Sequence, residues 1–214
     1  MEALFFIIAF FAVIAVAIGR LVFARSPEKI GKYGEDAVSS ALSRLDADVY
    51  HVMNDIMIPD GNGGTTQIDH VVFSPYGIFV IETKNYSGWI FGDVKSARWC
   101  STHYGDRHYF QNPYRQNYKH ICCLSSLMRL PRSLFISAVA FPGDCTVKTR
   151  DKLPPSFTTS GGELRDFILS HTTVQLEKTS LASFETMLRQ AAIANDEKSV
   201  ALHVSYLRQR NRGS

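Results

Sequence analysis

The chain lacks the cysteine patterns of secreted and zinc-binding proteins. It has four cysteines in 214 residues, and the adjacent pair Cys122 and Cys123 does not resemble a secreted disulfide framework. It has no Cys-x-x-Cys pair, which leaves a zinc site built from Cys100 and nearby histidines without support. The Gly-rich segment 59–64 is not followed by Gly-Lys-Ser/Thr, so it is no phosphate-binding P-loop. The cysteine pattern favours a protein of a reducing compartment.

Charge is also absent from residues 3–19, which are dominated by Phe, Ile, Val and Ala, and the apolar character resumes after Arg20. This segment is long enough to span a bilayer, and Arg20 can extend its charged group to the interface. The chain opens with Met1-Glu2, without the basic start of a cleaved secretory signal. The positive charges follow the segment, at Arg20, Arg25, Lys29 and Lys32. Under the positive-inside rule we expect residues 1–24 to be a single transmembrane helix in the inner, cytoplasmic membrane, with the catalytic domain facing the cytoplasm.

The remaining residues are enough for one domain with a sizeable core. Hydrophobic periodicity predicts a first helix over residues 34–45 and a later helix from Pro113 to about Leu130. Strands are expected at 49–58, 66–73, 77–84 and 133–141, with shorter strand-like pieces at 89–94 and 97–102. Further helices are expected at 161–169, 181–192 and 199–207. This order predicts an α/β core over residues 25–150, whose last strand is parallel to a neighbour, and a helical extension over 151–214 packed on it.

Two strands joined by the turn Ser74-Pro75-Tyr76-Gly77 carry an acid and a Glu-x-Lys pair. Side chains alternate along a strand, so Glu82 and Lys84 share a face, and the hairpin brings Asp69 beside them. Two carboxylates and one ammonium are a suitable set for a divalent metal and a phosphate. The alternative is a cross-strand charge cluster that only forms ion pairs. Charges directly after the apolar run 78–81 would be costly without a function, which favours the metal site.

Four segments of the chain occur in the order found in one family of nucleases. They are Gly-Lys-Tyr-Gly-Glu at 31–35, Gln-Ile-Asp-His at 67–70, Gly-Ile-Phe-Val-Ile-Glu-Thr-Lys-Asn-Tyr-Ser-Gly at 77–88, and Asn-Pro-Tyr-Arg-Gln-Asn at 112–117. Together they resemble the nuclease-related domain, a branch of the PD-(D/E)xK nuclease superfamily. The resemblance implies a nuclease-like core with a mixed central sheet flanked by helices. Ile68 stands where the superfamily usually has Pro before its first metal-binding Asp, a feature that we attribute to this branch.

The resemblance also implies roles for individual residues. Asp69 and Glu82 would bind Mg²⁺, or Mn²⁺, with the main-chain carbonyl of Thr83, and Lys84 would hold a water or the phosphate. Glu35 from the first helix and Gln116 from the later helix would complete the catalytic set. Nucleic-acid contacts are expected from Gln67, which shares the face of Asp69, and from Arg115 and Lys119, which lie four residues apart on one helix face.

The stretch from Lys95 to Arg132 contains seven Lys/Arg residues and a single acid, Asp106. Its aromatic residues are Trp99, Tyr104, Tyr109, Phe110, Tyr114 and Tyr118. Basic and aromatic side chains together predict a nucleic-acid surface beside the site. A solvated face over ordinary core aromatics, or an attraction to anionic lipid, would give the same composition.

Three functional hypotheses follow. The first is a membrane-anchored, Mg²⁺-dependent nuclease that acts on DNA. The second is a catalytically silent nucleic-acid-binding module on the same fold, and the third is a membrane-associated interaction protein whose charges are structural. The complete Asp, Glu-x-Lys set favours the first hypothesis over the second, because a site that no longer cuts need not retain all three residues.

Overall fold

The computed structural model describes residues 27–103, 105–194 and 196–212. The predicted membrane-spanning segment, residues 1–24, lies outside the described residues, as does Tyr104. Within the described ranges, no helix has the length and apolar character needed to cross a bilayer.

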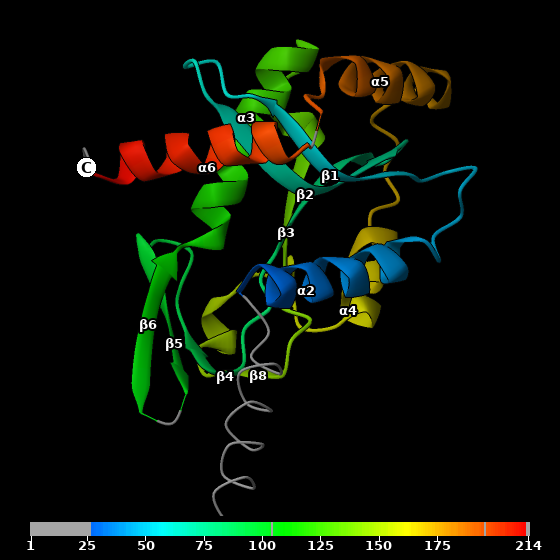
Figure 1. Cartoon of the computed structure of the whole chain (residues 1–214). Helices are drawn as coiled ribbons and strands as arrows, with labels where there is room; N and C mark the ends of the chain where they lie inside the picture. The colour runs from blue at the N-terminus through cyan, green and yellow to red at the C-terminus, as the bar shows by residue number, and fades with distance from the viewer. Residues whose placement is uncertain (1–26, 104, 195, 213–214) are drawn as a thin grey trace, which may run out of the picture.

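A five-stranded mixed sheet with the order β1-β2-β3-β7-β9 forms the centre of the molecule (Figure 1). Strands β1 (His51–Pro59), β2 (Thr65–Ser74) and β3 (Gly77–Thr83) follow one another as an antiparallel meander. Strand β7 (Phe135–Ala140) pairs in parallel with β3, as predicted, and β9 (Phe157–Thr158) pairs in parallel with β7. Every residue of β3 is buried, because helices cover both faces of the sheet.

Helices α3 (Pro113–Met128) and α5 (Lys178–Ala191) pack against one face of this sheet, and α2 (Pro27–Leu42) and α4 (Gly161–Leu169) against the other (Figure 1). Alternation along β3 supplies both interfaces: Val80 packs with α3, whereas Phe79 and Ile81 pack with α2 and α4. Helix α3 is fixed to the sheet by the buried Asn117, whose amide nitrogen donates to the Val80 carbonyl over 2.7 Å.

Four strands form a second sheet, with the order β6-β5-β4-β8, that the sequence did not predict. They are β4 (Gly88–Phe91), β5 (Arg98–His103), β6 (Asp106–Gln111) and β8 (Cys145–Val147). We expected only β4 and β5, as short pieces. Strand β6 buries only Phe110 and so has no apolar pattern, while β8 and β9 are too short to show a period.

The helix boundaries differ from the predictions mainly at their starts. Helix α2 begins at Pro27 rather than residue 34, and α5 begins at Lys178 rather than residue 181, whereas α4 covers the predicted 161–169. The last helix, α6 (Glu197–Arg212), is longer than predicted and runs in front of β1 and β2 in Figure 1. The described residues also include short 3₁₀ turns at Arg132–Leu134 and Arg150–Lys152.

Candidate active site

A cleft of about 910 Å³ opens where the ends of β2 and β3 meet the start of α2, the first turns of α3, the second sheet and α6. Most of the residues that line it have polar side chains. The acids and lysines among the lining residues are Glu35, Asp69, Glu82, Asp144, Lys84 and Lys119. Such a concentration of ionisable side chains in one cleft marks a candidate site for chemistry.

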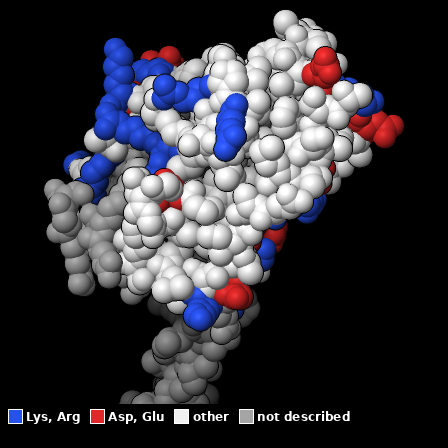
Figure 2. Space-filling view, turned by 90° about the horizontal axis from the view of Figure 1, so that it is seen from above, with Lys and Arg blue, Asp and Glu red and all other residues white. Residues whose placement is uncertain are grey.

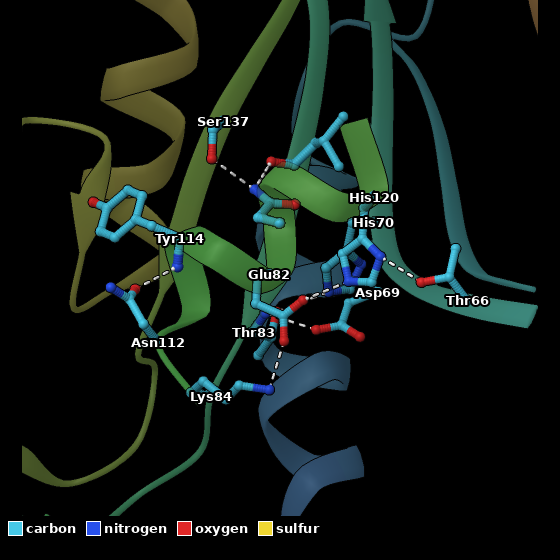
Figure 3. A network of polar contacts seen from close by, with 12 residues as sticks. Thr66, Asp69, His70, Glu82, Thr83, Lys84, Asn112, Tyr114, His120 and Ser137 are labelled. Carbon is cyan, nitrogen blue, oxygen red and sulfur yellow. Dashed lines mark hydrogen bonds and ion pairs between the residues drawn. The ribbon is translucent and has the colours of Figure 1, made fainter. Parts of the chain in front are cut away.

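The β2–β3 hairpin sets the register of the central acids. His70 pairs with Ile81, which places Asp69 next to Glu82, and the Thr83 backbone N–H donates to Asp69 Oδ2 over 2.7 Å. Glu82 is in β3 and Lys84 directly follows the strand, and the Lys84 ammonium is 2.5 Å from Glu82 Oε1 (Figure 3). The hairpin therefore brings Asp69, Glu82 and Lys84 together at one end of the cleft.

Helix α3 supplies a histidine that the sequence reasoning missed. His120 Nε2 lies 3.1 Å from Glu82 Oε2, and its Nδ1 lies 2.8 Å from Thr66 Oγ1, so a chain of polar contacts links β2, α3 and β3 (Figure 3). His120 is four residues after Gln116 and therefore lies on the same helix face, and this spacing could have identified it from the sequence.

The charges around Glu82 shift its pKa and those of its neighbours. Burial alone would raise the pKa of Glu82, but Lys84 and His120 outweigh burial and lower it. For Asp69, burial and the nearby Glu82 charge raise the pKa well above its usual range, against the smaller effect of Lys84. Burial would lower the pKa of Lys84, but the two carboxylates raise it, so the ammonium stays charged. Of the two carboxyl groups, Asp69 therefore loses its proton less readily than an ordinary aspartate, and Glu82 loses its proton more readily than an ordinary glutamate.

Glu35, Gln67, Gln116 and Lys119, which the sequence singled out, also line the cleft. Burial and the negative charge of Asp55 raise the pKa of Glu35, while Lys32 and Lys84 oppose them. Gln67 donates its amide to Asp55 Oδ1 over 2.6 Å.

The two basic residues predicted to share a face of α3 have different environments. Lys119 forms an ion pair with the buried Asp60 at 3.0 Å and lines the cleft. Arg115 is not a lining residue: it is exposed and donates to the Lys95 carbonyl over 2.6 Å. Their nucleic-acid contacts stay predictions.

The aromatic residues of the basic stretch are divided between core and surface. Trp99, Phe110 and Tyr114 are buried in the cluster beneath the second sheet, so the structure contradicts a nucleic-acid role for these three. Tyr109 and Tyr118 are exposed. Part of the predicted nucleic-acid surface is therefore ordinary core, which was the alternative explanation for these aromatic residues.

The Asn-Pro-Tyr segment at the start of α3 connects this helix to the second sheet. Asn112 is fully buried, and its side-chain oxygen accepts from the Tyr114 N–H as a helix cap. Its amide nitrogen contacts three carbonyl oxygens of the loop between β4 and β5, those of Asp93, Val94 and Ser96. The segment that resembles the family motif thus fixes where α3 begins, and with it the positions of Gln116 and His120.

The donor set suits a hard divalent cation that keeps much of its own water. The described residues contain no group of three or more His, Cys, Asp or Glu side chains arranged as metal ligands. Asp69 and Glu82 do provide two adjacent carboxylates, and the buried Glu82 Oε1 forms an ion pair with the Lys84 ammonium but accepts no hydrogen bond from the described residues. Mg²⁺ commonly binds through one or two carboxylates plus water and substrate phosphate, so these residues fit it.

Comparisons with known proteins identify relatives of the chain. Residues 30–142 match the nuclease-related domain family. The chain is also 37% identical over 216 residues to an uncharacterized protein of Bacillus anthracis, in an alignment that covers 97% of each chain. No solved structure matches the chain.

Proposed function

Because the chain belongs to the nuclease-related domain family, we propose that it is a metal-dependent nuclease that hydrolyses phosphodiester bonds in DNA. The observation that carries the proposal is the convergence of Asp69, Glu82 and Lys84 at one end of a polar cleft. Two adjacent carboxylates repel each other, which favours binding of a cation between them, and a charged lysine beside them favours binding of a phosphate.

Asp69, Glu82 and the Thr83 carbonyl would hold Mg²⁺ or Mn²⁺. The bound ion would supply a more acidic water and neutralise negative charge that develops on the phosphate. Lys84 contributes a fixed positive charge for a phosphate oxygen or the attacking water, because its raised pKa prevents it from acting as a base at neutral pH.

Residues from two helices would orient the substrate. Gln116 lines the cleft one helical turn before His120, where its amide can donate to a phosphate oxygen. Glu35 lines the cleft from α2, where its carboxylate could accept a proton and return it. His120 and Thr66 act as positioning residues, because His120 holds the Glu82 carboxylate and Thr66 holds the His120 ring.

The proposal includes a membrane anchor formed by residues 1–24, which rests on the uncharged apolar segment and the basic residues after it. The full chain should then sediment with membranes and be released by detergent but not by high salt. A variant without residues 1–24 should remain in the supernatant, and sedimentation of that variant would argue against the anchor.

Cleavage assays with the full chain in mild detergent test the nuclease. Linear, circular and single-stranded DNA and RNA would be incubated with Mg²⁺, Mn²⁺ or EDTA. We expect cleavage of DNA that requires a metal, with Asp69→Ala and Lys84→Ala slowing it by about 100-fold or more.

The matched controls are Asp166→Ala in α4 and Lys152→Ala in the 3₁₀ turn Arg150–Lys152, because both residues are exposed and neither lines the cleft, and both variants should cut normally. Cleavage that persists in EDTA or in both site variants would contradict the proposal. Salt-dependent binding of DNA without cleavage would instead favour the catalytically silent binding module.

A further inference from the structure

The outer face of the second sheet exposes large aromatic side chains. Trp89 is 54% exposed, Tyr109 is 50% exposed and Phe91 is 38% exposed. Exposed apolar groups gathered on one face of a protein usually mark a site for a partner.

Strand register places these three residues on one face. Trp89 pairs with Thr102 and Phe91 with Cys100 across β4 and β5, and Cys100 pairs with Tyr109 across β5 and β6. Directly paired residues point to the same side of a sheet. Trp89, Phe91 and Tyr109 therefore form one surface, which we call the aromatic platform.

The opposite face of the same sheet is core. Ile90, Trp99 and Phe110 alternate with the platform residues and pack on Phe141 and Phe157. Burial of this inner face is enough to hold the sheet against the rest of the molecule, so packing does not explain the aromatic residues on the outside.

The platform borders a hollow of about 830 Å³ and carries positive charge. Arg107 lines the hollow, while Lys148 lies over the Trp89 ring at 4.4 Å and Arg98 over the Tyr109 ring at 5.6 Å. The residues that line the hollow include no Asp or Glu. An anionic partner that also has flat rings would match both properties.

We propose that the aromatic platform binds single-stranded DNA, with bases stacked on Trp89, Phe91 and Tyr109 and phosphates beside Arg98, Arg107 and Lys148. Stacking on aromatic side chains in a basic groove is how proteins hold single strands without reading their sequence. A duplex keeps its bases stacked inside, so it offers the platform only phosphates.

The platform is continuous with the cleft. His103, at the end of β5, lines both the hollow and the cleft that contains Asp69 and Glu82. A single strand of DNA that lies on the platform can therefore continue past His103 and enter the cleft. This inference deepens the proposed nuclease by assigning it a single-stranded substrate, and it rests on the proposed function for the cutting step alone.

Binding is measured by fluorescence anisotropy of a labelled oligothymidylate with the full chain in detergent and EDTA, so that no cleavage occurs. We expect Trp89→Ala and Tyr109→Ala each to weaken binding roughly 5-fold to 100-fold, the range of one lost stacking contact. Tyr118→Ala is the matched control, because Tyr118 is also exposed and also has an arginine, Arg132, over its ring, but lies on α3. It should bind normally.

Circular dichroism of each variant establishes that the fold is intact, which is expected because the replaced rings are exposed. The platform would be overturned if Tyr118→Ala weakened oligothymidylate binding as much as the platform variants do, or if Trp89→Ala and Tyr109→Ala bound it as tightly as the wild type. It would also be overturned if the wild type bound duplex DNA or oligouridylate as tightly as oligothymidylate. The platform would also be wrong if the protein failed to bind oligothymidylate but bound phosphatidylserine vesicles, and if this vesicle binding were lost in Trp89→Ala.

The same variants separate the two proposals. If metal-dependent cleavage persists while platform variants bind normally, the nuclease stands and the platform is wrong. If the platform variants lose binding while the wild type cuts nothing, the platform stands and the nuclease is wrong. If both proposals hold, Trp89→Ala raises KM for a single-stranded substrate and leaves kcat near the wild-type value.

Discussion

At the scale of single residues, the site is a pair of carboxyl groups whose pKa values are shifted in opposite directions. Burial and Glu82 raise the pKa of Asp69, while Lys84 and His120 keep the pKa of Glu82 low. A divalent cation between the two carboxylates would favour the charged form of both, so metal binding and protein stability should be linked.

Magnesium should therefore stabilise the protein through Asp69. At a Mg²⁺ concentration 100-fold above its Kd, we expect the free energy of unfolding to rise by about 2.7 kcal/mol. Asp69→Asn should lose this increase, yet in EDTA it should be at least as stable as the wild type, because it removes the repulsion with Glu82. Thermal unfolding with and without Mg²⁺ measures both effects. An equal Mg²⁺ response in the two proteins would contradict the assignment of Asp69 as a ligand.

His120→Ala should destabilise the fold, because it leaves the buried Glu82 Oε2 and the Thr66 hydroxyl without their partner. The expected cost is about 1–3 kcal/mol, the usual penalty for an unsatisfied buried group. Urea unfolding in EDTA gives the value. His108→Ala, an exposed histidine on β6, serves as control and should change stability by less than about 0.5 kcal/mol. A cost for His120→Ala as small as that of the control would show that Glu82 does not need this contact.

At the scale of elements, one loop acid connects parts of the chain that are far apart in sequence. Asp60, in the loop between β1 and β2, accepts from the N–H groups of Asn62 and Gly64 through one oxygen. Its other oxygen accepts from Lys119 of α3 and from the Tyr206 hydroxyl of α6. This acid therefore fixes the wall of the cleft formed by α3 and α6.

Asp60→Asn should destabilise the protein at neutral pH by about 1.5–3 kcal/mol, because hydrogen bonds to a charged group are lost. Burial would raise the pKa of Asp60, but its hydrogen bonds and Lys119 outweigh burial and hold the pKa well below its usual range. A lowered folded-state pKa contributes stability above the unfolded-state value of about 3.9, and that stability is lost as the pH falls further.

The difference in stability between wild type and Asp60→Asn should consequently shrink as the pH is lowered from about 4 towards the folded-state pKa. Urea unfolding at several pH values measures it, with the exposed Asp48→Asn as control. A difference that stays constant on acidification would mean that Asp60 is not ionised in the folded protein.

At the scale of the whole molecule, charge is distributed unevenly. The net charge is only +3, but Lys and Arg side chains gather toward one edge of the face seen in Figure 2, while much of the rest of that face is uncharged. Uneven charge of this kind attracts polyanions more than the net charge suggests.

Binding of oligothymidylate should weaken as salt rises, because three platform cations displace counterions from phosphates. For three contacts, the slope of log K against log salt concentration should be about −2. Arg107→Gln should make the slope shallower by about 0.7, whereas Lys178→Gln, an exposed lysine at the start of α5 on the central sheet, should not change it. A slope near zero would mean that stacking acts without phosphate contacts.

The sequence predicted the parts of this protein that depend on local geometry. A hairpin with a short turn has few possible registers, so Asp69, Glu82 and Lys84 had to converge once β2 and β3 were recognised. The long helices were also visible, because a period of 3.6 residues repeats several times within α3 and α5. Family membership followed from short motifs that lie in these same elements.

What the sequence alone determined is thus the first four strands of the central sheet, the helices that cover it and the group of acids, since each arises from periodicity or a tight turn, whereas the two-residue strand β9 was not predicted. Only the tertiary structure decided the second sheet, where β8 pairs in parallel with β4 although Val147 lies 57 residues after its partner Ile90, and no short-range pattern specifies such a pairing. It also decided which aromatics are core and which form the platform, and that His120 and Asp60 support the cleft. These contacts join distant segments, and their formation depends on the packing of the whole chain.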